Sequence, residues 1–129
     1  MRMEFDWSVC ELRWRRIHHC AVIGDADGVR GELAGGEAVD VKNIWCETAL
    51  LLAAKAGRVE SVAALLMGGA SVDASNYVND TALQVACDGG HLECVMELLE
   101  RGARVNEKND IRSTPLHIAS RNGHVECVR

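Results

Sequence analysis

The sequence has few aromatic residues and almost no proline. Phe, Trp and Tyr together make up 4% of its 129 residues, and a single Pro stands against twelve Gly. β-Sandwiches rely on aromatic and β-branched residues, and rigid linkers rely on proline, so both are poor candidates. Hydrophobic residues make up 48% of the chain, which is enough for the core of one domain. We therefore expect one domain of helices that pack through small residues.

The sequence also has no long apolar segment. Its longest uninterrupted apolar runs, such as Ala49–Ala54, are far shorter than the roughly 20 residues of a membrane-spanning helix. The N-terminal stretch MRMEFDWSVCELRWRR has no apolar segment followed by a small-residue cleavage site, which a secretory signal needs. We expect a cytoplasmic or nuclear protein that does not insert into membranes, with its six Cys reduced.

Positive charge is in deficit as well. Fourteen Lys and Arg stand against nineteen Asp and Glu, and the formal net charge is −5. Phosphate backbones are bound by clustered positive charge, so nucleic acid is not an expected partner. Arg13, Arg15 and Arg16 around Trp14 form a local basic group, which we interpret as a solvated outer face.

The most informative feature is an internal repeat. Aligning the sequence with itself at a shift of 33 residues matches three long segments without a gap. The matched positions are a Thr that precedes x-Leu, a small residue, a helix-ending glycine and a leucine pair. They are Thr48, Thr81 and Thr114; Ala53, Ala86 and Ala119; Gly57, Gly90 and Gly123; and Leu65-Leu66 with Leu98-Leu99. Matches at Gly24 and Val39-Asp40 indicate a more divergent copy before them.

Each copy predicts two short helices and an extended connection. The Thr can accept a hydrogen bond from a free backbone N–H and so begin the first helix, and the Gly ends it. The second helix carries a stripe of apolar residues, namely Val62, Leu65 and Leu66 in one copy and Leu92, Val95, Leu98 and Leu99 in the next. A helix pair this short cannot bury its apolar face alone. The pairs must therefore stack into a solenoid.

The repeat resembles the ankyrin repeat in its period and in the signature T-P-L-H-x-A, which residues Thr114–Ala119 reproduce. The resemblance implies an all-α solenoid of stacked helix pairs joined by β-hairpin-like loops. We interpret residues 1–129 as one domain with a divergent N-terminal capping repeat (8–39), two regular repeats (40–72 and 73–105) and a truncated repeat (106–129). Because the last repeat stops within its second helix, we expect a fragment of a longer array.

The sequence departs from the family pattern at the hairpin. Where the family has a glycine, this chain has Cys46, Asn79 and Arg112. Asn tolerates a positive φ best of the three, so the other two predict strain or an altered turn. The histidine of T-P-L-H is also replaced, by Leu51 and Gln84, in the two preceding regular repeats.

Two patterns of chemically active residues compete with a packing role. His91-x-x-Cys94 and His124-x-x-Cys127 could in principle supply four ligands to zinc. The cysteines, however, stand at an inward position that Ser61 fills in an earlier repeat, so we favour packing. The run His18-His19-Cys20 offers a thiol and a base, but no nucleophile turn or phosphate loop accompanies it. We expect no metal, no cofactor and no enzyme activity.

In ankyrin repeats the hairpin tips and the concave face of the first helix contact the partner. The resemblance therefore implies protein-binding residues at Ile44, Trp45, Glu47, Lys55, Tyr77, Val78, Asp80, Asp88, Asp110, Ile111, Ser113, Arg121 and Asn122. The apolar tip residues either contact a partner or fold back onto the neighbouring hairpin. We favour Trp45 and Tyr77 as anchors, and the acidic residues around them favour a partner that presents Lys or Arg.

The resemblance also implies a modification site. Asn106 matches the position at which asparaginyl hydroxylases modify ankyrin repeats, with Leu98 at the preferred spacing. Arg104 stands where an acidic residue is favoured.

The expected function is a monomeric, non-enzymatic scaffold for protein–protein interaction. An alternative is a structural spacer or cap of a larger ankyrin-repeat protein, with the active module outside this chain. The recurring E-C-V of the second helix is similar to that of ubiquitin-ligase substrate receptors. An enzyme regulated by such repeats is a further possibility.

Overall fold

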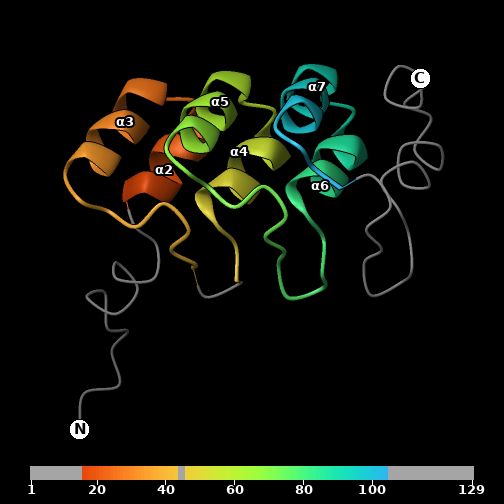
Figure 1. Cartoon of the computed structure of the whole chain (residues 1–129), viewed down its shortest axis with the longest axis horizontal. Helices are drawn as coiled ribbons and strands as arrows, with labels where there is room; N and C mark the ends of the chain where they lie inside the picture. Colours follow the sequence, from red (N-terminus) through yellow and green to blue (C-terminus); the bar gives the residue numbers. More distant parts are fainter. Residues whose placement is uncertain (1–15, 44–45, 105–129) are drawn as a thin grey trace, which may run out of the picture.

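The computed structural model describes residues 16–43 and 46–104 of the chain. These residues form six helices in three consecutive pairs (Figure 1). The pairs are α2 (Arg16–Ile23) with α3 (Ala26–Ala34), α4 (Ala49–Ala56) with α5 (Val59–Met67), and α6 (Ala82–Gly89) with α7 (Leu92–Glu100). Within the described residues, β-structure is confined to an isolated antiparallel bridge between Ser75 and Thr81. The predicted all-α architecture is confirmed.

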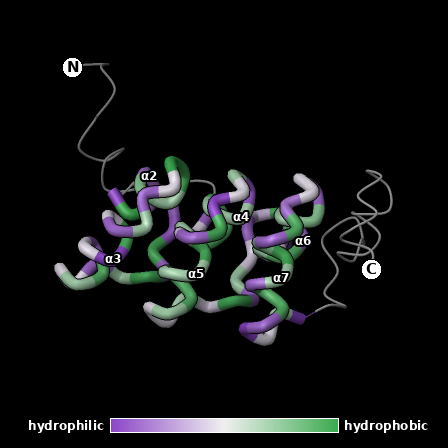
Figure 2. Tube along the Cα trace, turned by 90° about the horizontal axis from the view of Figure 1, so that it is seen from above, coloured by the Kyte–Doolittle hydropathy of each residue, from purple (hydrophilic) through white to green (hydrophobic). Residues whose placement is uncertain are grey.

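The helix pairs stack side by side in two rows. α4 packs against α2 on one side and α6 on the other, and these three form the inner row. α5 packs in the same way between α3 and α7, which form the outer row (Figure 2). The connections between consecutive pairs extend away from the helices in one direction, next to the inner row (Figure 1). This arrangement is the expected solenoid with projecting loops.

The inner helices begin at threonines and end at glycines, as the repeat predicts. The Thr48 hydroxyl accepts a hydrogen bond from the Leu51 N–H at 3.3 Å and begins α4. Thr81 begins α6 in the same way, and its own N–H donates to Gln84 Oε1 at 2.8 Å. This reciprocal pair is a capping box. Gly57 (φ 73°) and Gly90 (φ 69°) close the two helices in the left-handed conformation that glycine adopts without strain.

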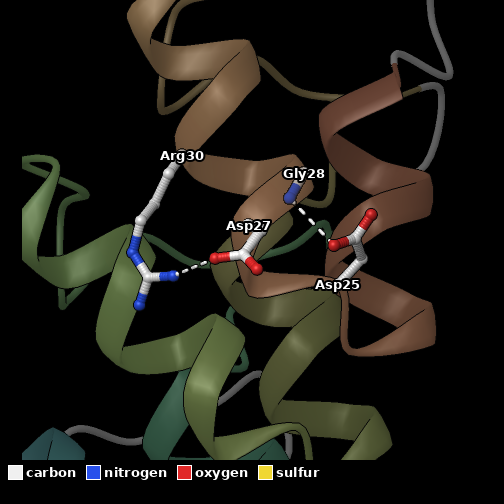
Figure 3. Close-up of polar contacts among 4 residues, drawn as sticks. All are labelled: Asp25, Asp27, Gly28 and Arg30. Atoms are coloured by element: carbon white, nitrogen blue, oxygen red, sulfur yellow. Dashed lines mark hydrogen bonds and ion pairs between the residues drawn. The ribbon is translucent and has the colours of Figure 1, made fainter.

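The three outer helices begin at equivalent positions of the repeat, which are occupied by Asp25, Arg58 and His91. Asp25 caps its own helix, because its Oδ1 accepts from the Gly28 N–H at 2.9 Å, and one turn further Arg30 donates to Asp27 (Figure 3). Arg58 and His91 make no such cap. They reach instead to the preceding pair, where Arg58 Nε donates to the Val22 carbonyl at 3.0 Å and His91 Nε2 to the Lys55 carbonyl at 3.1 Å. The same position therefore serves first as a cap and then as a link between neighbouring pairs.

A second set of links joins the pairs near the loops. The Asp40 carboxylate accepts a hydrogen bond from the Ser71 N–H at 3.0 Å, and the Asp73 carboxylate accepts from the Arg104 N–H at 3.1 Å. In both cases acceptor and donor are 31 residues apart, so the contact repeats from pair to pair.

The core runs continuously through the stack between the two rows. It is built from small and branched residues such as Ile17, Leu50, Leu65 and Leu98, all at most 1% exposed. Leu65 and Leu98 lie on the apolar stripe that the repeat predicts for the second helix. The prediction was wrong for Leu99, which is 42% exposed, because it occupies the outward edge of α7 and not its buried side.

Two buried polar side chains occupy the histidine position of T-P-L-H. Gln84 is fully buried and completes the capping box of α6. His18 is also fully buried, and its Nε2 lies 2.9 Å from the Val41 carbonyl. Because a carbonyl only accepts, Nε2 must carry the proton. The divergent first pair thus keeps the histidine at this position, which a shift of 33 residues from Leu51 could have identified.

Candidate functional site

The best-defined loop of the predicted binding surface is the hairpin tip between α5 and α6. Asn76 holds it together, because its Oδ1 accepts from the N–H groups of both Val78 and Asp80 at 3.0 Å. The Asn76 N–H also donates to the Asp80 carbonyl at 3.1 Å. Asn79 completes the turn at φ 62°, a value that Asn tolerates. The tip is therefore a hydrogen-bonded turn with a defined shape.

The preceding hairpin, between α3 and α4, has the same design. The Asn43 Oδ1 accepts from the Glu47 N–H at 3.0 Å, and Asn43 Nδ2 donates to the Glu47 carboxylate at 3.3 Å. Cys46 stands at φ 60°, so this residue keeps the family's turn and carries the backbone strain that glycine would avoid. The predicted binding residue Ile44 and the predicted anchor Trp45 lie outside the described residues.

Lys42 joins the two hairpins. Its Nζ lies 3.5 Å from the Ser75 carbonyl, at the edge of hydrogen-bond distance. The offset in the sequence indicates this contact, because Lys42 and Ser75 are 33 residues apart and so hold the same place in consecutive repeats.

The described tip residues differ in how much of each side chain is exposed to solvent. The Tyr77 side chain is 69% exposed, which argues against the alternative in which it folds back onto a neighbouring hairpin. Val78 and Asp80 are partly buried, and Glu47 is partly buried and bonded to Asn43. Of the predicted tip residues within the described ranges, Tyr77 alone projects freely into solvent.

The inner row adds two exposed charged residues to the predicted site. Lys55 near the end of α4 and Asp88 near the end of α6 are both exposed and hold equivalent positions one repeat apart. Tyr77, Lys55 and Asp88 are thus the predicted site residues that the structure leaves accessible on one side of the stack. The remaining predicted residues lie outside the described ranges; these are Asp110, Ile111, Ser113, Arg121 and Asn122, together with the modification site Asn106.

The structure describes two of the four residues of the alternative zinc site, His91 and Cys94. His91 and Cys94 line a surface cavity of about 340 Å³ together with Gly57, Leu92 and Glu93. His91 Nε2 is already bound to the Lys55 carbonyl. Burial raises the pKa of the Cys94 thiol to about 11, with a smaller contribution from Glu93. The thiolate is the form that binds zinc, so this cysteine is poorly suited at neutral pH. His124 and Cys127 lie outside the described residues.

The residues of the run His18-His19-Cys20 do not share one environment in the structure. His18 and Cys20 are buried, whereas His19 is exposed. Burial is the main cause that raises the pKa of the Cys20 thiol, and Asp25 and Glu32 add to it. A protonated thiol beside a histidine committed to the Val41 carbonyl does not form a nucleophile and base.

Among residues 16–43 and 46–104, no three His, Cys, Asp or Glu side chains are grouped so that they could hold a metal ion. In that same part of the chain, no helix has the length and apolar character needed to span a bilayer.

Comparison with known proteins agrees with this geometry. The family model described as "Ankyrin repeats (3 copies)" matches residues 17–109 and, in a second overlapping match, residues 73–129. A search of the curated proteins gives no significant match. The family matches cover most of the chain and include all three helix pairs. This chain therefore belongs to the ankyrin-repeat family.

Proposed function

We propose that this chain is a non-enzymatic scaffold that binds another protein through its hairpin tips and the adjoining face of the inner row. Ankyrin repeats generally act as protein–protein interaction modules, and the family is typically non-enzymatic. The proposal assigns that role to particular residues: Tyr77 as an anchor, Lys55 and Asp88 as flanking polar contacts, and Trp45 as a second anchor on the neighbouring tip.

The observation that carries the proposal is the exposure of Tyr77 on an ordered turn. Leaving a large aromatic ring 69% exposed forgoes the gain from burying it in the core. The Asn76 side chain fixes the backbone on both sides of the ring, so little conformational freedom remains to be lost on binding. Rigid aromatic residues of this kind are enriched among interface hot spots.

The charges near Tyr77 favour a partner that presents Lys or Arg. Glu47, Asp80 and Asp88 lie on the hairpins and the inner row, and Lys42 and Lys55 are exposed basic residues of the same elements. A negative surface attracts a basic partner and mainly speeds association, an effect that salt screens. The association rate should therefore fall as ionic strength rises.

A photo-cross-linking residue at position 77 tests the proposal directly. The matched control carries the same residue at Arg30, whose side chain is 56% exposed on the outer row. We expect a partner protein to be cross-linked from position 77 and not from position 30. Cross-linking from neither position would favour the alternative of a structural spacer.

Substitution then measures the contribution of each ring. With the partner purified, Tyr77→Ala and Trp45→Ala should each weaken binding by about 2 kcal/mol and leave the melting temperature unchanged. Tyr77→Phe serves as the control and should keep most of the affinity. If the melting temperature drops while affinity holds, the rings belong to the scaffold and the proposal is wrong.

A further inference from the structure

We propose that α5 and α7 of the outer row form a second docking surface, which takes a basic amphipathic helix of a partner protein. This surface lies on the opposite row from the hairpin tips and the inner helices (Figure 2). It does not depend on the function proposed above, and the two can be tested separately.

The surface is centred on two methionines. Met67 on α5 is 71% exposed and Met96 on α7 is 52% exposed. In α7 the buried residues Cys94, Val95 and Leu98 occupy one side of the helix, and Met96 lies on the other. Packing in the core therefore does not require an apolar side chain at position 96.

The repeat does not require methionine at either position. The equivalent residues of α3 are Ala34 for Met67 and Arg30 for Met96, and Arg30 pairs with Asp27 in solvent. The Met67 position is Glu100 in α7, and the Met96 position is Ala63 in α5, so each exposed methionine is specific to its own helix. Methionine is flexible and polarisable, and it is common where a surface must adapt to a bound helix.

Negative charge predominates within the two helices that carry the methionines. α5 and α7 contain four glutamates, Glu60, Glu93, Glu97 and Glu100, and no Lys, Arg or His. Glu97 is bonded to Arg101 just beyond α7 at 3.4 Å. The other three are exposed. A surface that is apolar at its centre and acidic around it is complementary to a ligand with an apolar stripe flanked by Lys or Arg.

Both spacing and charge point to a helix as the occupant. Packed neighbouring helices lie about 8–10 Å apart, and residues i and i+7 of one helix are separated by about 10 Å. Met96 holds the position of Ala63 in α5, four residues before Met67, so the two methionines lie on the same face about one turn apart along the row. A helix laid obliquely across α5 and α7 could therefore place apolar residues roughly one heptad apart over Met67 and Met96. A second copy of this chain is a poor occupant, because it would oppose four glutamates with four glutamates.

The test uses the full chain and a synthetic helical peptide. The probe is a peptide of about four turns, roughly 14 residues, with a Leu stripe flanked by Lys. One control peptide has the same composition in scrambled order, and another has Glu in place of Lys. Methyl NMR of the chain labelled at methionine reports directly on Met67 and Met96, and peptide fluorescence anisotropy gives the affinity.

The basic amphipathic peptide should shift the methyl signals of Met67 and Met96. The double variant Met67→Gln/Met96→Gln should weaken its binding by about tenfold, and Glu93→Gln should weaken it and reduce its salt dependence. Tyr77→Ala should leave the affinity unchanged, which separates this surface from the hairpin site. Melting curves check that each variant is folded.

Several results would overturn the proposal. The scrambled or the Glu peptide could bind as well as the basic one, or the basic peptide could leave both methyl signals unmoved. Methyl shifts that grow with the concentration of the chain alone would assign the surface to self-association.

Discussion

Ser61 is the buried side chain that the described part of the chain leaves without a hydrogen bond. The residue is fully buried in α5, and its hydroxyl has no partner. The equivalent position in α7 is Cys94, which is also buried and behaves as a small hydrophobe. Burying an unpaired hydroxyl costs free energy that a sulfur or a methyl group does not. The two repeats therefore fill the same space at different energetic cost.

Ser61→Ala should raise the free energy of unfolding by about 1 kcal/mol, because it removes the unpaired hydroxyl and leaves only a small void. Ser61→Cys should have a similar effect. Urea unfolding measures both, and Ser71→Ala at an exposed position is the control, with no change expected. A loss of stability in Ser61→Ala would mean that the hydroxyl is satisfied in solution.

The turn between α6 and α7 depends on the fit of the His91 ring between two glycines. A Cβ added at Gly57 would lie 2.6 Å from His91 Nδ1, and one added at Gly89 would lie 2.5 Å from His91 Nε2. Such distances are too short for any side chain. The glycines thus make room for the ring, whose Nε2 binds the carbonyl near the end of α4.

A double-mutant cycle tests this fit. Gly89 is the last residue of α6, where alanine would normally stabilise a helix. We expect Gly89→Ala to destabilise the chain by about 1 kcal/mol, because it displaces the ring and breaks its hydrogen bond. In a His91→Ala background the same substitution should be neutral or stabilising. Equal effects in both backgrounds would show that ring and glycine do not interact.

The sequence predicted the helices better than it predicted the contacts between them. The threonine caps, the closing glycines and the buried positions of Val62, Leu65, Val95 and Leu98 all follow from spacing within one repeat. The bonds from Arg58 to Val22 and from His91 to Lys55 span 36 residues. Local periodicity does not say in which direction a side chain at a helix start will turn.

The candidate site shows the same limit. The turn-forming asparagines could be predicted because they recur at the tips, and Tyr77 could be proposed as exposed from its place there. The pattern could not tell that Glu47 would bond to Asn43, or that Val78 would be half-buried. These outcomes depend on how closely adjacent hairpins pack, which one repeat alone does not determine.

Contacts between consecutive helix pairs hold the whole stack together. Asp40 and Asp73 each follow one helix pair and accept a backbone N–H from the segment after the next pair, and Arg58 and His91 each bind a carbonyl of the preceding pair. In solenoids, stability is the sum of the intrinsic terms of the repeats and the terms between neighbours. Weakening one link should therefore lower the stability of the pairs on both sides of it.

Asp73 allows this coupling to be measured. Asp73→Ala removes the acceptor of the Arg104 N–H and should lower the free energy of unfolding by about 1 kcal/mol. Asp73→Asn keeps an acceptor oxygen and loses mainly the exposed ion pair with Arg104, so it should cost only a few tenths of a kcal/mol. Chemical denaturation compares the two variants. A loss as large for Asn as for Ala would show that the ion pair is the source of the stability.

The constant offset of the Asp40 and Asp73 links bears on how such an array can lengthen during evolution. A unit counted as one helix pair with the connection that follows it brings one carboxylate that accepts from the next such unit and one backbone N–H that donates to the unit before it. A tandem duplication of one unit therefore creates a new junction with both partners already present. Because the donor is backbone, its side chain can change without breaking the link. Copies inserted in this way are joined from the outset, and their exposed residues are free to diverge.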